Sequence, residues 1–146
     1  MKKKTKKPTR QDYIKELDSV FSTFIRLRDS NDKWIVICPL CWTKLPRKQS
    51  QNMHFVSRGV MKHRYDEKNC HAWCMRCNVI LNGNYIAYTR RMQKTYGISY
   101  VDRLIADKWP YKIPTPMLVE MIHHYQAKVD KLLIKDAKAQ ISAIRG

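Results

Sequence analysis

Residues 54–84 read HFVSRGVMKHRYDEKNCHAWCMRCNVILNGN, which places three His, three Cys and four Asn close together along the chain. Imidazole, thiolate and amide groups are side chains that proteins use to bind metal ions. Arg and Lys lie between them, and such cations bind phosphate groups. The stretch therefore predicts either a metal-stabilised structural unit or a unit of that kind with a reactive site on it.

The bulk composition indicates a protein that binds a polyanion. The chain has 146 residues, which suits one domain with a helical extension, and its formal net charge is +17. Such an excess of Lys and Arg is typical of proteins that neutralise phosphates, so we expect a nucleic-acid partner and no membrane. No apolar run reaches the length of a membrane span, and the N-terminal MKKKTKKPTR lacks the apolar segment of a secretory signal. We therefore expect a cytoplasmic protein.

Four of the five cysteines form two Cys-x-x-Cys pairs, Cys38 with Cys41 and Cys74 with Cys77. In a basic chain without a secretory signal, this pattern indicates a reducing compartment and a metal. Four thiolates complete the tetrahedral shell of Zn²⁺, so the predicted zinc is structural. A redox-active pair is the alternative, but nothing around either pair resembles a thioredoxin-like setting. Cys70 is expected to be a small buried filler, or to exchange with one of the ligands.

Hydrophobic spacing predicts an α+β fold in which a small zinc-stapled core lies between an N-terminal helix and a long C-terminal amphipathic helix. Within the core we expect strands at 34–37 and 53–56, a loop over 43–52, and a helix over 72–81. The predicted organisation is a basic disordered arm over 1–9, a helix over 10–30, the core over 31–97, and a helical region over 98–146.

The order of a strand His, then an Asn, then an Asn directly after a Cys-x-x-Cys pair resembles the HNH, or ββα-metal, nucleases. His54, Asn69 and Asn78 carry this pattern, and it is similar to the endonuclease VII group of phage junction resolvases. Within residues 38–97, the runs HFVSRG, RYDEKN, CMRCN and NGNYIAY more closely resemble the NinG/Rap family of lambdoid phage recombination endonucleases. The resemblance implies a metal-dependent endonuclease that cuts branched DNA, such as Holliday junctions and D-loops, in the cytoplasm of a bacterial host.

The same resemblance implies roles for the three residues. His54 would be the general base that takes a proton from water. Asn69 would orient the His54 ring or hold the loop between strand and helix. Asn78 would give its carbonyl oxygen to a catalytic Mg²⁺ or Mn²⁺, since hard cations prefer oxygen ligands.

One residue departs from the pattern of that superfamily. Many HNH nucleases carry Asp just before the catalytic His as a second metal ligand, whereas this chain has Met53 there. We expect His71 to replace it as a ligand, or else to hydrogen-bond the scissile phosphate, with Asp66 and Glu67 as further candidates. An imidazole ligand would favour Mn²⁺ over Mg²⁺.

The basic residues around the motif are candidates for DNA contacts. Arg58 follows His54 by four residues and is expected to clamp the phosphate, as a catalytic residue. Five others are expected to follow the DNA backbone, and they are Lys62, Arg64, Arg76, Arg90 and Arg91. No base-reading module is recognisable, which favours recognition of DNA shape over sequence and argues against a homing or restriction enzyme.

Two alternatives stay open at the level of the sequence. The chain is either the endonuclease described above or a non-catalytic zinc-ribbon DNA-binding protein that assists recombination, and Met53 favours the second. The C-terminal helix carries apolar residues at alternating spacings of four and three, a coiled-coil-like seam formed by Leu118, Ile122, Tyr125, Val129 and Leu132. This seam either packs back on the domain or forms a homodimer, which would present two active sites to a junction.

Overall fold

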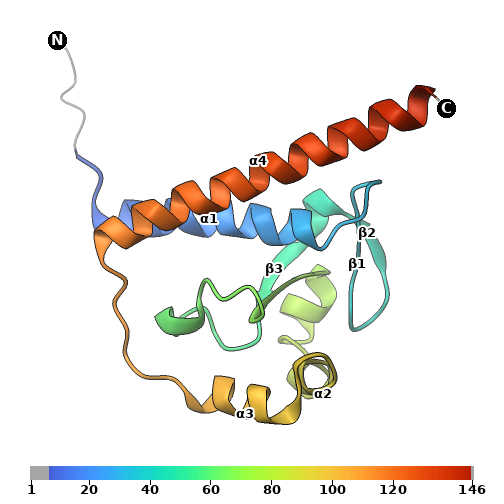
Figure 1. The fold of residues 1–146 in the computed structure, drawn as a ribbon. Coiled ribbons are helices and arrows are strands. Elements are labelled where there is room, and N and C mark those ends of the chain that lie inside the picture. Colours follow the sequence, from blue (N-terminus) through green and yellow to red (C-terminus); the bar gives the residue numbers. More distant parts are fainter. Residues whose placement is uncertain (1–6, 146) are drawn as a thin grey trace.

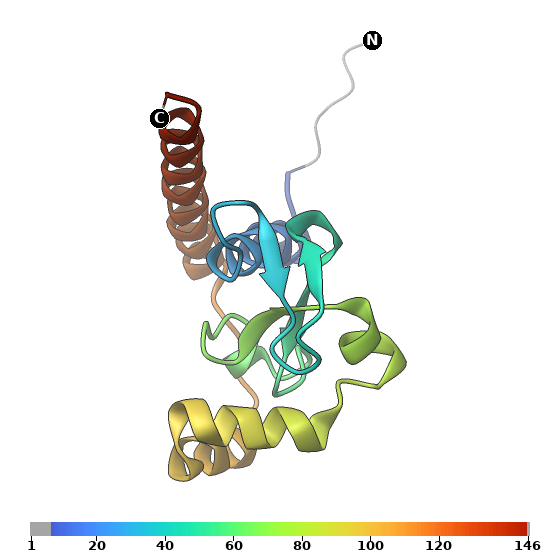
Figure 2. The same ribbon diagram turned by 90° about the vertical axis from the view of Figure 1, so that its right-hand side faces the viewer.

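The computed structural model describes residues 7–145, and these form three layers (Figure 1). The long helices α1 (Arg10–Arg28) and α4 (Thr115–Arg145) lie side by side as the first layer. Short strands form the middle layer, and α2 (Tyr85–Tyr96) and α3 (Ile98–Ala106) cover its other side, as Figure 2 also shows. The mixed α+β class predicted from the sequence is confirmed.

The middle layer contains two separate two-stranded sheets. In the first, β1 (Ile35–Ile37) pairs with β2 (Lys44–Pro46), and in the second, β3 (Gln51–His54) pairs with β4 (Cys70–Trp73). Both pairings are antiparallel. Three short helical segments connect these elements, the 3₁₀ turns η1 (Arg47–Gln49) and η2 (Met61–His63) and the π-helix η3 (Arg76–Ile80).

The first helix begins where the sequence indicates. Thr9 and Asp12 form a capping box, in which the Thr9 hydroxyl accepts from the Asp12 amide and the Asp12 carboxylate accepts from the Thr9 amide at 2.8 Å. The apolar face of the helix then buries Leu17, Phe21 and Ile25. The predicted disordered arm falls mostly on residues 1–6, which lie outside the described residues.

The C-terminal helix packs back onto α1 through the predicted seam. Leu118, Ile122, Tyr125 and Val129 are buried in the core that the two helices share. The Tyr125 ring meets the edge of Phe21 with ring centroids 4.8 Å apart, a favourable aromatic geometry. This part of the seam is therefore used within the chain. A homodimer stays a prediction, and the distal half of α4 exposes apolar residues that such a contact could use, namely Leu133, Ile134, Ile141 and Ile144.

Two predictions about the core were wrong. Residues 43–52 are not a loop, because Lys44–Pro46 pair with β1 as strand β2, and β3 already begins at Gln51. Strands of three or four residues are too short to display an alternating pattern. Residues 72–81 are not one helix, because Ala72 and Trp73 belong to β4 and the chain becomes helical only after Cys74.

The turn between α2 and α3 depends on a glycine. Gly97 has φ +88° and ψ +151°, a backbone conformation that residues with a Cβ rarely adopt. It lets the chain turn sharply, so that Val101 and Leu104 of α3 reach the core.

Among the described residues, no helix is both long and apolar enough to cross a bilayer.

Replacement of Gly97 by Ala should lower the free energy of unfolding by about 1–3 kcal/mol, the cost of holding a residue with a Cβ in this conformation. The loss would come from the backbone alone, since a Cβ at this position meets no atom within 4 Å. Gly59→Ala is the matched control, because a Cβ there would meet only the Ser57 hydroxyl at 3.5 Å. Urea titrations measure both, and equal stability of the two variants would contradict the prediction.

Candidate functional site

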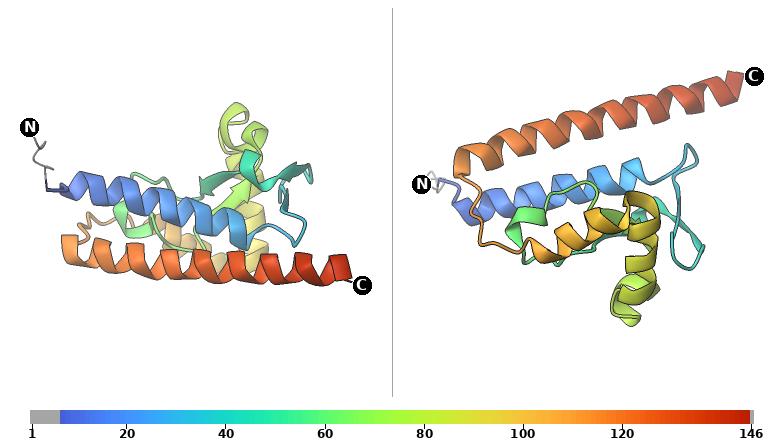
Figure 3. Two further views of the ribbon diagram at one scale, coloured as in Figure 1. Left: turned by 90° about the horizontal axis from the view of Figure 1, so that it is seen from above. Right: turned by 60° about the horizontal axis from the view of Figure 1, so that its bottom comes forward.

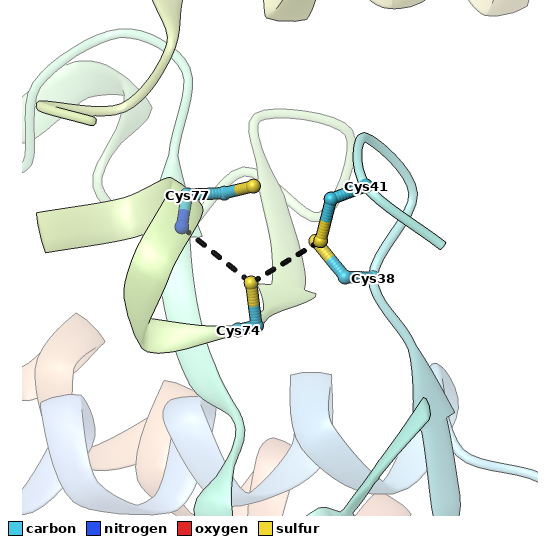
Figure 4. A group of neighbouring side chains, drawn as sticks. All are labelled: Cys38, Cys41, Cys74 and Cys77. Carbon is cyan, nitrogen blue, oxygen red and sulfur yellow. Dashed lines mark hydrogen bonds between the residues drawn. The ribbon is translucent and has the colours of Figure 1, made fainter. Parts of the chain in front are cut away.

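Four cysteines that lie far apart in the sequence come together beside the second sheet. Cys38 and Cys41 lie on the turn between β1 and β2, and Cys74 and Cys77 lie where β4 passes into η3. Their four sulfur atoms lie within 4.8 Å of one another, and Figure 4 shows the side chains converging. Tetrahedral Zn²⁺ with bonds of about 2.3 Å needs sulfurs separated by roughly 3.8 Å. The cluster can therefore hold a zinc ion.

The thiols of the cluster differ in acidity. Burial raises the pKa of the Cys74 and Cys77 thiols. A hydrogen bond with the Thr43 hydroxyl instead lowers the pKa of Cys41 to about 6. A cation among the sulfurs would favour the thiolate form of all four. Cys70 is buried on β4, outside the cluster, as expected for a filler.

His54 ends strand β3 with its ring held by a backbone carbonyl. Its Nε2 lies 3.0 Å from the carbonyl oxygen of Arg64, and because a carbonyl can only accept, Nε2 carries the hydrogen. In the neutral ring, Nδ1 then keeps its lone pair and can accept a proton. Burial lowers the pKa of His54, and the positive charges of Arg58 and Arg64 lower it further, so the ring is neutral near pH 7.

Asn69 holds a loop and makes no bond to the His54 ring. It is fully buried, and its Oδ1 accepts from the Val56 amide at 2.7 Å. Its Nδ2 donates to the carbonyl oxygens of Val56 and His63, at 3.0 and 2.9 Å. Of the two roles considered for Asn69, the geometry matches the holding of a loop, but this loop connects strand β3 to strand β4 and not a strand to a helix.

A cavity of about 510 Å³ brings His54 and Asn78 together. Asn78 lies in η3, and its Nδ2 donates to Oε1 of Gln51 at 2.7 Å, which fixes the orientation of the amide. The Oδ1 atom of Asn78 has no hydrogen-bond partner within residues 7–144, so it is available as an oxygen ligand. Met53, Asn82, Tyr85 and Lys108 also line this cavity.

His71 is separated from this cavity. It pairs with Met53 across the sheet, yet its ring lies between two tyrosines, with Nδ1 2.8 Å from the Tyr88 hydroxyl and Nε2 3.1 Å from the Tyr96 hydroxyl. Burial lowers the pKa of His71 to about 4. Both ring nitrogens are therefore engaged, and His71 is not among the residues that line the His54 cavity. This geometry does not match the predicted role of a metal ligand or a phosphate contact.

The other two candidates for a second metal ligand also lie elsewhere. The Asp66 carboxylate accepts from the Lys68 amide, and Glu67 accepts from Lys128 and Tyr125 of the last helix. Among the described residues, none of the side chains that line the cavity is a carboxylate. A divalent ion would therefore find only neutral protein ligands here.

The basic residues divide into internal and exposed groups. Arg64 is mostly buried and binds Asp18 of α1 through Nε and Nη2, so it supports the loop that carries the His54 acceptor. Arg58 also contacts Asp18 but is 63% exposed, and Lys62 pairs with Asp107. The remaining three candidates for DNA contacts are exposed, and they are Arg76, Arg90 and Arg91.

Sequence reasoning missed the supporting residues Asp18, Gln51 and Lys108. Asp18 belongs to a helix that ends well before the motif, and Lys108 comes from the chain between α3 and α4. No local pattern connects either of them with His54. Gln51 precedes His54 by three residues, but its role depends on Asn78, which only the folded chain brings to it.

Comparison with known proteins places the chain in one family. The model of the family described as bacteriophage lambda NinG protein matches residues 1–135. The ninG protein of Salmonella phage P22 is 26% identical over 128 residues, which are 88% of this chain and 60% of that protein. The ninG proteins of Escherichia phage 933W and Enterobacteria phage VT2-Sa are each 27% identical over 92 residues, which are 63% of this chain and 44% of theirs.

The chain thus spans less than two thirds of the length of these relatives. No solved structure matches it. The family match covers the strands, the cysteine cluster and the cavity with His54 and Asn78. The chain belongs to the NinG family of bacteriophage proteins.

Proposed function

We propose that this chain is a metal-dependent, structure-specific endonuclease that hydrolyses phosphodiesters in branched recombination DNA, such as Holliday junctions and D-loops. One observation carries the proposal: a neutral histidine with a free Nδ1 and an amide with a free oxygen line the same cavity. This pairs a proton acceptor with an oxygen ligand, the two protein groups that metal-assisted hydrolysis of a phosphodiester needs. In this proposal the enzyme acts in the cytoplasm of the infected bacterium.

The order of the elements supports an HNH-type site. His54 ends β3, the loop held by Asn69 follows, and β4 leads into η3, which carries Asn78. Two strands are thus followed by a helix, which is the order of elements expected for a ββα-metal core. In this assignment His54 accepts the proton of the attacking water, and the Arg64 carbonyl keeps its ring in the required tautomer.

Arg58 is the residue suited to bind the scissile phosphate. Its guanidinium is largely exposed and touches one oxygen of Asp18, so it can turn toward DNA at little cost. Arg64 holds the same carboxylate through two nitrogens and would keep Asp18 paired after that movement. Arg58 also contributes to lowering the pKa of His54, which keeps the base neutral.

The donor set fits a weakly held catalytic ion. Asn78 Oδ1 is a suitable ligand for Mg²⁺ or Mn²⁺, which supply Lewis-acid stabilisation of the phosphate and the leaving oxygen when bound. Mg²⁺ sites of proteins generally use one or two carboxylates together with substrate phosphates, and no described residue of this cavity provides a carboxylate. The DNA phosphate would therefore provide the negative charge that the protein lacks.

The charge distribution supports DNA as the partner. Between Lys33 and Val101 the chain has twelve Lys and Arg but only two acidic residues, Asp66 and Glu67. Both acids are engaged with groups of the protein. Arg47, Arg58, Lys62 and Arg64 pair with acids from other segments, whereas Arg76, Arg90 and Arg91 are exposed. The exposed cations can pair with phosphates, which provides affinity without reading the base sequence.

The second candidate is a non-catalytic zinc-ribbon protein that binds DNA during recombination. The absence of a carboxylate among the described lining residues and the presence of Met53 favour it. A cleavage assay on four-way junction, D-loop, flap and linear duplex, with Mg²⁺ and Mn²⁺ in turn, decides between the two. Binding of branched DNA without cleavage of any substrate would support the second candidate.

The first prediction concerns zinc. We expect one Zn²⁺ per chain, and replacement of Cys38, Cys41, Cys74 or Cys77 by Ser should remove it and unfold the core, because metal binding is coupled to folding. Cys70→Ala is the control, since Cys70 lies outside the cluster, and it should keep its zinc. Metal analysis and circular dichroism measure both effects. Pure, folded protein that contains no zinc would disprove this assignment.

The second prediction concerns the base. His54→Ala should keep its affinity for a four-way junction and lose cleavage by about a hundredfold or more, the usual effect of removing a general base. His123→Ala, on the exposed side of α4, is the control and should cut normally.

The pH profile gives an independent check. Because burial lowers the pKa of His54, the ring stays able to accept a proton below the usual imidazole range. The cleavage rate should therefore hold its plateau through neutral pH and fall only at lower pH. If the His54→Ala variant cleaves branched DNA at the wild-type rate, His54 is not the general base.

The third prediction concerns the missing carboxylate. Met53 lines the cavity beside His54, so Met53→Asp would add a negative ligand there. We expect it to lower the Mg²⁺ concentration needed for half-maximal cleavage by about tenfold, the lower end of the effects seen when metal-site residues change. Met53→Leu is the control without charge. An unchanged Mg²⁺ requirement in an active Met53→Asp variant would mean that the ion binds elsewhere.

A further inference from the structure

An exposed group of large apolar side chains stands next to the His54 cavity. Six residues within the segment 75–86 are between 42% and 72% exposed. We call this group the apolar protrusion, and it consists of Met75, Val79, Ile80, Leu81, Tyr85 and Ile86. Figure 3 shows this part of the chain standing out from the strands on the side away from α1 and α4. So many exposed apolar residues in one short segment mark an interaction site.

The protrusion is anchored at both ends. At its start, Cys74 and Cys77 belong to the cysteine cluster, and the amide of Leu81 donates to the carbonyl of Arg76 in the π-helical turn. At its end, Asn82, Gly83 and Asn84 all have positive φ, a strained return that brings the chain back onto β3. Gly83 has φ +81°, which favours glycine, and its Cα side approaches the flexible end of Met53, whose Cε would lie 2.6 Å from an added Cβ.

The protrusion is continuous with the proposed catalytic cavity. Tyr85 lines that cavity together with His54 and Asn78, and its ring stacks on Phe55 with centroids 5.2 Å apart and an interplanar angle of 4°. A ligand that contacts Tyr85 therefore lies beside His54 and Asn78. A ligand with flat apolar faces matches Tyr85, and one with negative charge matches the cations around it.

The basic residues around the protrusion indicate an anionic partner. From Lys68 to Val101 the sequence has no acidic residue, and Arg76 and Arg90 are exposed on the two helical segments of this region. Arg90 lies one turn beyond Ile86 on α2, so the cation and the apolar side chain share a face. A nucleic acid with unstacked bases combines dense negative charge with flat apolar faces, and the flat faces match the Tyr85 ring.

We propose that the apolar protrusion packs against unstacked bases at a DNA branch point and thereby selects branched DNA over linear duplex. The proposal rests on the proposed function only in taking DNA as the partner. In a linear duplex the base faces are stacked, and opening them costs several kcal/mol. At a branch point the bases unstack at a lower free-energy cost. Apolar side chains can therefore contact base faces at a branch that are covered in a linear duplex. The DNA backbone beside that point would then lie over His54 and Asn78.

The test compares binding and base unstacking in full-length protein. The double variant combines Val79→Ser and Ile80→Ser, and it is made in the His54→Ala background, which is also the parent for comparison. This background prevents cleavage of the DNA during the measurement. Both residues are exposed, so the changes should not affect folding. Ile98→Ser is the matched control, because Ile98 is similarly exposed but lies beyond the opposite end of α2. The probes are a four-way junction with 2-aminopurine at the branch and a linear duplex of the same length.

We expect the double variant to bind the junction about tenfold or more weakly, as the loss of two buried aliphatic contacts implies. It should also lose the rise in 2-aminopurine fluorescence that the parent shows. Binding to linear duplex should change by less than about twofold, since phosphate contacts remain. The Ile98→Ser control should match its parent in every measurement.

Three results would overturn the proposal. The first is unchanged junction affinity and fluorescence in the double variant, and the second is an equal loss on junction and duplex. The third is a parent dimer that the double variant dissociates without any effect on DNA, which would show that a second copy of the chain covers the protrusion. If the protrusion behaves as expected but the wild type cuts no DNA with any divalent ion, the nuclease proposal fails while this inference stands.

Discussion

The buried amide of Asn69 is the interaction on which the arrangement of the site depends. Its three hydrogen bonds close the loop between β3 and β4, and that loop carries the Arg64 carbonyl that holds His54. Each bond contributes about 1 kcal/mol, but a buried backbone group left without a partner costs about 1–3 kcal/mol. Loss of the amide would therefore leave three such groups unsatisfied. Few other side chains would satisfy both Val56 and His63.

The cysteine cluster is the second constraint, and it acts on the other half of the site. Asn78 follows Cys77 directly, so the position of the sulfur limits the position of the amide. Gln51 then fixes how the amide is turned. His54 and Asn78 come from separate segments, and their meeting in one cavity depends on Asn69 for the first and on the cluster for the second.

The acidic residues explain how a chain with so large a positive charge stays folded and keeps a basic surface. Asp18 binds Arg58 and Arg64, Asp29 binds Arg28 and the Ala72 amide, and Asp136 binds Arg47 and Trp34. These carboxylates connect α1 and α4 to β4, to η1 and to the loops beside the strands. Because these carboxylates are paired with groups inside the protein, they do not neutralise exposed cations such as Arg76, Arg90 and Arg91.

The sequence by itself determined the two long helices and the grouping of four cysteines. These follow from local rules: helical spacing and capping act within a few residues, and two Cys-x-x-Cys pairs have few uses other than metal binding. It did not determine β2, β4 or the π-helix, since strands of three or four residues are stabilised by partners distant in the chain. Only the tertiary structure decided that Asn69 holds a loop, that two tyrosines enclose His71, and that Arg64 lies inside. The physical reason is that the role of a polar side chain depends on the groups that share its buried surroundings, and those come from distant parts of the chain.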